Sequence, residues 1–133
     1  MNIQAFANDY TEFVKNNLII KKINEYHELY ELLPPFFNQN GDSVSIYIQE
    51  DKKEKKYFLT DDCQTINNLE MSGIELTEDK ISLIRSICIK DGVRLVDKEI
   101  QILASEEDLI AKTHSLIQVI LRVDSLIFLE KSE

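Results

Sequence analysis

The first apolar residues of the chain recur every three or four positions. Ile3, Phe6, Tyr10 and Phe13 follow this spacing, with small or polar residues between them. Because an α-helix repeats every 3.6 residues, such positions fall on one face. The pattern predicts an amphipathic helix over about residues 2–16.

The next stretch, residues 18–33, carries two patterns at once. Its first three residues, Leu-Ile-Ile, are typical of a strand, whereas the apolar residues from Ile23 to Leu33 also fit a helical stripe. A turn at Asn24-Glu25 would divide the stretch into two strands. We favour this hairpin and keep the helix as the alternative.

Alternating residues after a proline-rich loop predict a second hairpin. Pro34-Pro35 ends any helix before it, and Asn40-Gly41-Asp42 is a turn signal. Apolar and polar residues alternate over 44–48, and residues 57–59 are Tyr-Phe-Leu. We expect antiparallel strands there, joined by the charged loop 50–56.

Two short helices and a third hairpin should follow. The first helix covers about residues 63–71 and ends near Gly73, and Thr77 is placed to cap the second, which Gly92 ends. Apolar residues then alternate on both sides of Asp97-Lys98, which predicts the hairpin.

The last predicted element is a long helix over about residues 106–128. The stretch from Ser105 to Asp108 resembles a capping box at its start. Helices grouped beside an antiparallel sheet define the α+β class. We therefore expect one α+β domain over residues 1–133, with its hairpins forming the sheet. An N-terminal helix, two middle helices and the long C-terminal helix would pack on that sheet.

Composition fits one globular domain with a strong negative charge. Apolar residues make up 44% of the 133 positions and charged residues 29%, and the net charge is −9. This charge disfavours direct nucleic-acid binding and favours a protein partner with a basic surface. Cys63 and Cys88 form no C-x-x-C motif, so we expect no structural zinc and no cofactor.

The sequence also predicts a cytoplasmic location. Its first residues lack the basic and apolar regions of a signal peptide, and no apolar run approaches the roughly 20 residues that span a bilayer. Two free thiols suit a reducing compartment. We expect no contact with a membrane.

Asp61, Asp62 and Glu70 are the candidates for chemistry. Carboxylates at the end of a strand could hold Mg²⁺, as in a metal-dependent nuclease. Alternatively, an Asp here caps the helix that follows, by accepting backbone N–H bonds. We favour the cap, because adjacent strand residues point to opposite faces and no general acid lies nearby. The sequence thus predicts no catalytic residues and no metal site.

A set of aromatic residues lies on both sides of the proline-rich loop. Aromatic side chains are enriched among the residues that dominate protein–protein binding. With the three carboxylates, they form our predicted partner-binding set. The alternative is that they cover the open end of the sheet. They are Tyr26, Tyr30, Phe36, Phe37 and Tyr47.

The stretch Y-x-L-T-D-D-x-x-T-I-x-x-L-E-x-S-G, from Tyr57 to Gly73, resembles a prokaryotic family known as domain of unknown function 1828. The resemblance continues in the Gly-Val-x-Leu of residues 92–95 and in the late helix, from Ala111 to Gln118. It implies a small bacterial or phage protein and no particular activity. Relatives often have Gly where this chain has Cys63, which suggests that this position does not need a positive φ.

These observations favour a non-catalytic binding protein of a bacterium, phage or mobile element. Its sharpest form is an inhibitor of a host defence nuclease, such as an anti-CRISPR protein, that occupies a basic nucleic-acid-binding surface. A toxin–antitoxin or immunity partner would share this chemistry. The alternative is a small metal-dependent enzyme, nuclease-like, that uses Asp61, Asp62 and Glu70.

The end of the last helix has more apolar residues than one face of a helix needs. Leu126, Ile127, Phe128 and Leu129 are consecutive. A second copy could cover the surplus, so the pattern is compatible with a homodimer through this helix.

Overall fold

The computed structural model describes residues 1–24 and 26–131. The chain begins with helix α1, Ile3–Asn16, which precedes the strand pair β1, Ile19–Asn24, and β2, Leu29–Leu33. A long loop leads to β3, Ile46–Asp51, and β4, Lys56–Thr60. Two helices follow, α2 over Gln64–Met71 and α3 over Glu78–Lys90. The chain ends with β5, Arg94–Val96, β6, Glu99–Ser105, α4, Leu109–Asp124, and α5, Ile127–Lys131.

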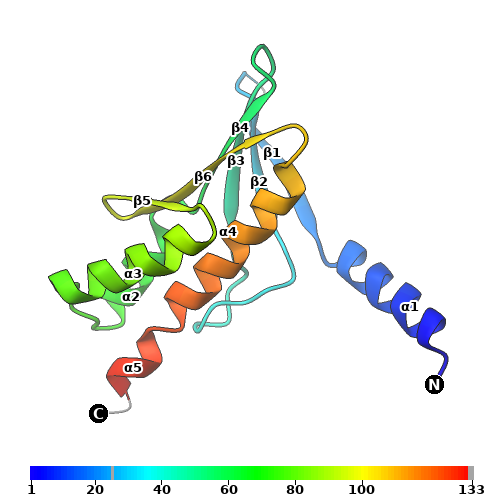
Figure 1. The fold of residues 1–133 in the computed structure, drawn as a ribbon. Coiled ribbons are helices and arrows are strands. Elements are labelled where there is room, and N and C mark those ends of the chain that lie inside the picture. Colours follow the sequence, from blue (N-terminus) through cyan, green and yellow to red (C-terminus); the bar gives the residue numbers. More distant parts are fainter. Residues whose placement is uncertain (25, 132–133) are drawn as a thin grey trace.

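The six strands form one antiparallel sheet in the order β1-β2-β3-β4-β6-β5. Helix α4 packs on β4 and β6, and α3 packs on β5, so the helices gather on one face of one half of the sheet (Figure 1). The predicted α+β class is confirmed. The expectation that the N-terminal helix packs on the sheet is wrong, because α1 contributes no buried residue and extends away from the sheet (Figure 1). Residues 18–33 form the favoured hairpin, although Glu25 of its predicted turn lies outside the described residues.

Strand register places the core on the helix-covered face. Side chains alternate across a strand, so directly paired residues share a face. Leu32 pairs with Ile46, and Leu59 pairs with Ile102, and all four are buried. The opposite face carries a polar row in register, which consists of Glu31, Tyr47, Thr60, Gln101 and Arg94.

The middle helices begin and end where the sequence predicts. The Thr77 hydroxyl accepts the Lys80 N–H at 3.3 Å, which caps α3 as expected. Gly73 follows α2 with a φ of +92°, a conformation that glycine adopts without strain. Local sequence therefore suffices to set these boundaries.

The C-terminal helix differs from its prediction. Instead of one helix over 106–128, α4 ends at Asp124 and α5 starts at Ile127. After this break the side chain of Ile127 is buried in the core, whereas that of Phe128 is exposed. The capping-box contacts form, with the Ser105 N–H donating to Asp108 Oδ1, but they close a turn before α4 rather than the first helical turn.

Buried Asp124 at the end of α4 holds the long loop that precedes β3. Its Oδ2 accepts the Gln39 N–H at 2.9 Å, across 85 residues of sequence. Burial raises the pKa of this carboxyl, and the hydrogen bonds from Gln39 oppose the rise. In the part of the chain that the structure describes, every helix is too short or too polar to span a bilayer.

Candidate functional site

Asp61 is almost completely buried at the junction of β4, β6 and α2, with 1% of its surface exposed. Its Oδ1 accepts the N–H groups of Cys63 at 3.0 Å and Ile100 at 2.9 Å, and its Oδ2 accepts the Thr65 N–H at 3.1 Å. Burial raises the pKa of this carboxyl, and the backbone hydrogen bonds oppose the rise. Both oxygens of Asp61 are therefore committed to backbone amides.

These contacts explain why an acid stands at this point of the sequence. The Thr65 N–H lies in the first turn of α2, where backbone donors lack intrahelical partners. Asp61 satisfies it from two residues before the N-cap, Cys63, whose own side chain makes no capping bond. The predicted capping role is confirmed. Asp61 also joins this helix start to β6 through Ile100, which the sequence did not indicate.

A tight turn between β4 and α2 places these groups. Asp62 and Cys63 both have left-handed backbones, with φ of 54° and 65°. The expectation that position 63 does not need a positive φ is wrong. Glycine adopts this conformation freely, whereas a residue with a Cβ is strained in it. Thr60 supports the turn, because its Oγ1 accepts the Asp62 N–H and donates to Glu99 Oε2.

The other two predicted carboxylates have separate roles. Asp62 is exposed, and Glu70 forms an ion pair with Lys98, with 2.7 Å between Oε1 and Nζ. Across residues 1–24 and 26–131, no three His, Cys, Asp or Glu side chains gather as a metal ion would require. Asp61, Asp62 and Glu70 are thus neighbours in sequence rather than a common ligand set.

Carboxylates from two parts of the chain instead act on the thiol of Cys63 through their charge. Burial raises the pKa of this thiol first, and the charges of Asp61, Glu99, Asp62 and Asp97 raise it further. Asp97 and Glu99 come from the β5–β6 hairpin. We call the surface formed by Asp62, Asp97, Glu99 and the nearby Glu70 the acidic end.

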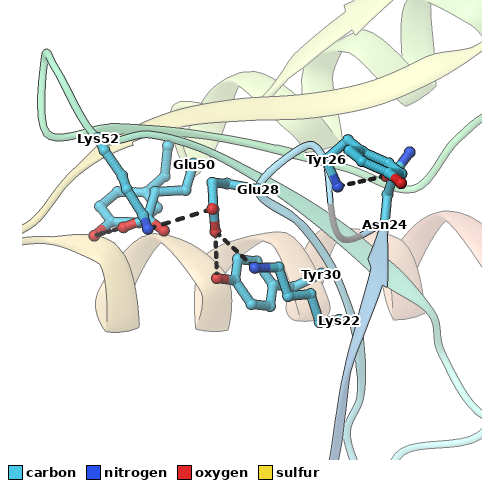
Figure 2. A network of polar contacts seen from close by, with 8 residues as sticks. Lys22, Asn24, Tyr26, Glu28, Tyr30, Glu50 and Lys52 are labelled. Atoms are coloured by element: carbon cyan, nitrogen blue, oxygen red, sulfur yellow. Dashed lines mark hydrogen bonds and ion pairs between the residues drawn. The ribbon is translucent and has the colours of Figure 1, made fainter.

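Tyr30 belongs to a polar network on the outer part of the sheet. Its hydroxyl donates to Glu28 Oε2 at 2.8 Å, and Lys22 and Lys52 approach the same carboxylate at 3.4 and 3.3 Å (Figure 2). The Tyr30 hydrogen bond and the Lys52 contact lower the pKa of Glu28, and the bond to Glu28 raises the pKa of Tyr30. Tyr26 lies at the exposed tip of the same hairpin, where its backbone N–H donates to Asn24 Oδ1 (Figure 2).

The remaining predicted aromatic residues lie elsewhere. Phe36 lies in the loop after β2 and lines an apolar groove, and exposed Phe37 bridges to Ser43 within that loop. Tyr47 lies on the face of the sheet opposite Tyr30, where its hydroxyl accepts a 3.5 Å contact from Gln64 Nε2. The structure therefore distributes seven of the eight predicted partner-binding residues over several parts of the molecule and buries the eighth, Asp61.

The apolar groove is the feature that sequence reasoning missed. It lies between the start of α4 and the β1–β3 half of the sheet, with a volume of about 360 Å³. Ile20 and Ile48 line it from the sheet, and exposed His114 lines it from α4. The signal was present in the apolar residues at the start of β1 and at the start of α4, but these segments are about 90 residues apart in sequence.

A single antiparallel sheet with helices gathered on one face defines this chain as an α+β protein. The chain belongs to the family described as Domain of unknown function DUF1828, whose model matches residues 34–123. The match starts after β2, so α1 and the first hairpin lie outside it. No curated protein and no solved structure gives a significant match.

Proposed function

We propose that this protein is a non-catalytic binding protein of a bacterium, phage or mobile element, and that its partner presents a basic nucleic-acid-binding surface. The sharpest form of the proposal is an anti-CRISPR-like inhibitor of a host defence nuclease. In that form the acidic end replaces nucleic-acid phosphates on the partner. Three observations on charge and geometry support the proposal.

The observation that carries the proposal is the uneven distribution of charge. Residues 61–108 contain twelve acidic and five basic residues, so this third of the chain supplies −7 of the net −9. Nine of the twelve acids lie in residues 61–105, which build α2, α3 and the β5–β6 hairpin, and the turn of that hairpin lies beside α2 and α3 in Figure 1. The other three, Glu106, Glu107 and Asp108, lie in the turn between β6 and α4. A field concentrated on one side steers the approach of a basic surface and orients it.

The acidic end is also held rigidly. Glu99 accepts from the Thr60 hydroxyl and from Gln101 Nε2, at 2.7 and 2.6 Å. Asp62 and Asp97 are exposed on tight turns with positive φ, which sets where their backbones lie. Charges fixed before binding lose little conformational freedom when a partner arrives.

The role of Asp61 supports a function without catalysis. A metal ligand or a general base needs a free lone pair aimed at the reacting group. In Asp61 both oxygens receive backbone N–H groups, two on Oδ1 and one on Oδ2. Glu70 is paired with Lys98. The geometry therefore favours recognition by charge over chemistry at the carboxylates.

Affinity capture at two ionic strengths tests the proposal. The tagged protein is incubated with a host lysate at about 0.1 M and about 1 M salt, where the Debye length falls from about 10 to about 3 Å. We expect a basic, nucleic-acid-binding protein to be captured at low salt only. Duplex DNA added as a competitor should displace it, because both ligands use the same surface.

Two matched variants locate the surface. In the first, Asp62→Asn, Glu75→Gln and Asp97→Asn neutralise three exposed acids among residues 61–108. The control changes Asp9→Asn, Glu12→Gln and Glu54→Gln, three exposed acids outside that range, and has the same net charge. Capture should fail in the first variant and persist in the control. Equal capture by both, or capture that DNA does not displace, would contradict the proposal.

A further inference from the structure

Helix α1 carries an apolar stripe that is largely exposed. Ile3, Phe6, Tyr10 and Phe13 lie on one face, and the three aromatic side chains are 58%, 62% and 58% exposed. The rings of Phe6 and Tyr10 stack with 6.4 Å between centroids. Within the described chain α1 contributes no buried residue, and in Figure 1 it extends away from the body of the molecule.

Such a helix needs a surface to be stable. Helices shorter than about 12–15 residues are marginal in water, and helices in proteins gain most of their stability by packing an apolar face. With 14 residues, α1 lies within this limit. Its N-cap is well formed, since Asn2 Oδ1 accepts the Ala5 N–H at 3.0 Å, but one cap does not replace a packing partner.

The same chain contains an apolar groove that could bind the apolar face of a helix. Helix α4 packs mainly on β4 and β6, and its first turns border the β1–β3 half of the helix-bearing face only along the edge of this groove. Ile20 and Ile48 form the groove floor, and Ile110 and Ile117 of α4 form a wall. Ile110 is 81% exposed although it lies beside this apolar surface. The space lies beside α4, where a second helix would pack on the sheet.

We propose that the groove binds α1 of a second copy of this chain, and that two copies exchange their α1 helices in a twofold homodimer. Only Asn17 and Leu18 separate α1 from β1, and Val14 and Leu18 already line the edge of the groove. The rest of α1 extends away from the sheet (Figure 1). If the helices are exchanged, α1 can keep its present direction. If α1 packed in the groove of its own chain, the chain would have to reverse direction within the two residues that separate α1 from β1.

The area is sufficient for a stable dimer. An aromatic side chain offers roughly 150–250 Å², so three that are about 60% exposed, together with Ile3, present on the order of 400 Å² per helix. The groove would lose a similar area. Two exchanged helices would then bury roughly 1,600 Å² in total, the size of a standard specific interface. The exposed Phe128 and Leu129 of α5 offer a smaller surface to a second copy.

Light scattering of the full chain after size exclusion provides the first test. We expect twice the protomer mass at about 100 μM, a hundredfold above a micromolar Kd. Phe6→Glu and Ile110→Glu should each restore the protomer mass. The matched controls, Asn8→Glu on the polar face of α1 and Ile89→Glu on α3, should stay dimeric. Ile89 is 76% exposed, close to the value for Ile110, and lies away from the groove.

Cross-linking then decides which chain supplies the helix. One chain carries Phe13→Cys and another, of different tag length, carries Ile110→Cys, both with Cys63→Ser. Oxidation of the mixture should give a disulfide-linked dimer that contains both tags. A chain carrying both cysteines that closes on itself when dilute would show that α1 packs on its own groove.

Besides an intrachain disulfide, three results would overturn the proposal: a wild-type protomer mass at all concentrations, a dimer unaffected by Ile110→Glu, or a dimer broken only by Phe128→Glu. The last result would place the interface on the C-terminal helix instead. Because none of these readouts involves the acidic end or its partner, the proposed function and the dimer can fail separately.

Discussion

Replacing Asp61 by Asn tests whether the buried carboxylate is a structural hub. The amide has one oxygen, which can keep the two N–H groups that Asp61 Oδ1 accepts, from Cys63 and Ile100. Its NH₂ group then faces the Thr65 N–H, a donor against a donor. The Thr65 N–H is left without an acceptor in a buried site.

The cost follows from that loss. A buried donor left unsatisfied costs about 1–3 kcal/mol, and bonds to charged groups lie at the upper end. We expect Asp61→Asn to lower the free energy of unfolding by about 2–3 kcal/mol near pH 7. For a chain of this size about 1 kcal/mol shifts Tm by roughly 3–5 °C, so Tm should fall by roughly 6–15 °C.

Adjacent Asp62 provides the control. Its side chain is exposed, and its left-handed backbone suits Asn as well as Asp. Asp62→Asn should therefore stay within about 0.5 kcal/mol of the wild type. Urea unfolding monitored by circular dichroism measures both variants. Equal stability of Asp61→Asn and the wild type would refute the structural role of the Asp61 carboxylate. An equal loss of stability in Asp62→Asn would refute it as well.

The pH dependence gives a second readout on the same pair. Burial raises the folded-state pKa of Asp61 above its ordinary value of 3.8. In the window from that value up to the raised pKa, the folded state binds more protons than the unfolded state. The contribution of Asp61 to stability therefore decreases as pH rises through this window. The stability difference between wild type and Asp61→Asn should shrink over the same range, and a difference that grows with pH would contradict the raised pKa.

Three further outcomes can be checked on the same preparations. Cys63→Gly should stabilise the protein by about 0.5–1 kcal/mol in urea unfolding, because glycine relieves the left-handed strain; a loss of stability would mean that the side chain packs favourably there. Leu59→Ala should cost about 2–5 kcal/mol, because the side chain is fully buried in the centre of the sheet, and a cost below 1 kcal/mol would contradict that packing. Purified protein with Mg²⁺ or Mn²⁺ should leave nucleic acids intact; cleavage that Asp62→Asn or Glu70→Gln abolishes would establish the metal-dependent enzyme instead.

Local sequence determined most of the elements. The spacing of Ile3, Phe6 and Tyr10 predicts α1, and the cap Thr77 and the stop Gly73 mark helix boundaries that the structure reproduces. These features depend on residues within one or two turns of each other. Hydrophobic period and capping chemistry act over that distance, so they can be read without knowing the fold.

The last helix shows where the periodicity misleads. After Ser125 four more apolar residues follow, from Leu126 to Leu129, so the pattern predicts that the helix continues without a break. The helix breaks between α4 and α5 instead, and Ile127 is buried in the core. Neighbouring elements decide which residues at the end of a helix are buried. The periodicity of the sequence contains no information about those elements.

The sequence by itself therefore determined the order of helices and strands, the α+β class, the capping role of an acid before α2 and the excess of negative charge. Only the tertiary structure decided that Asp61 also holds Ile100, 39 residues away, and that Cys63 is left-handed. It also decided that α1 has no surface of its own while a groove for a helix lies open beside α4. The physical reason is range: secondary structure follows from neighbours in sequence, whereas burial and satisfied hydrogen bonds depend on segments that meet only in the folded chain.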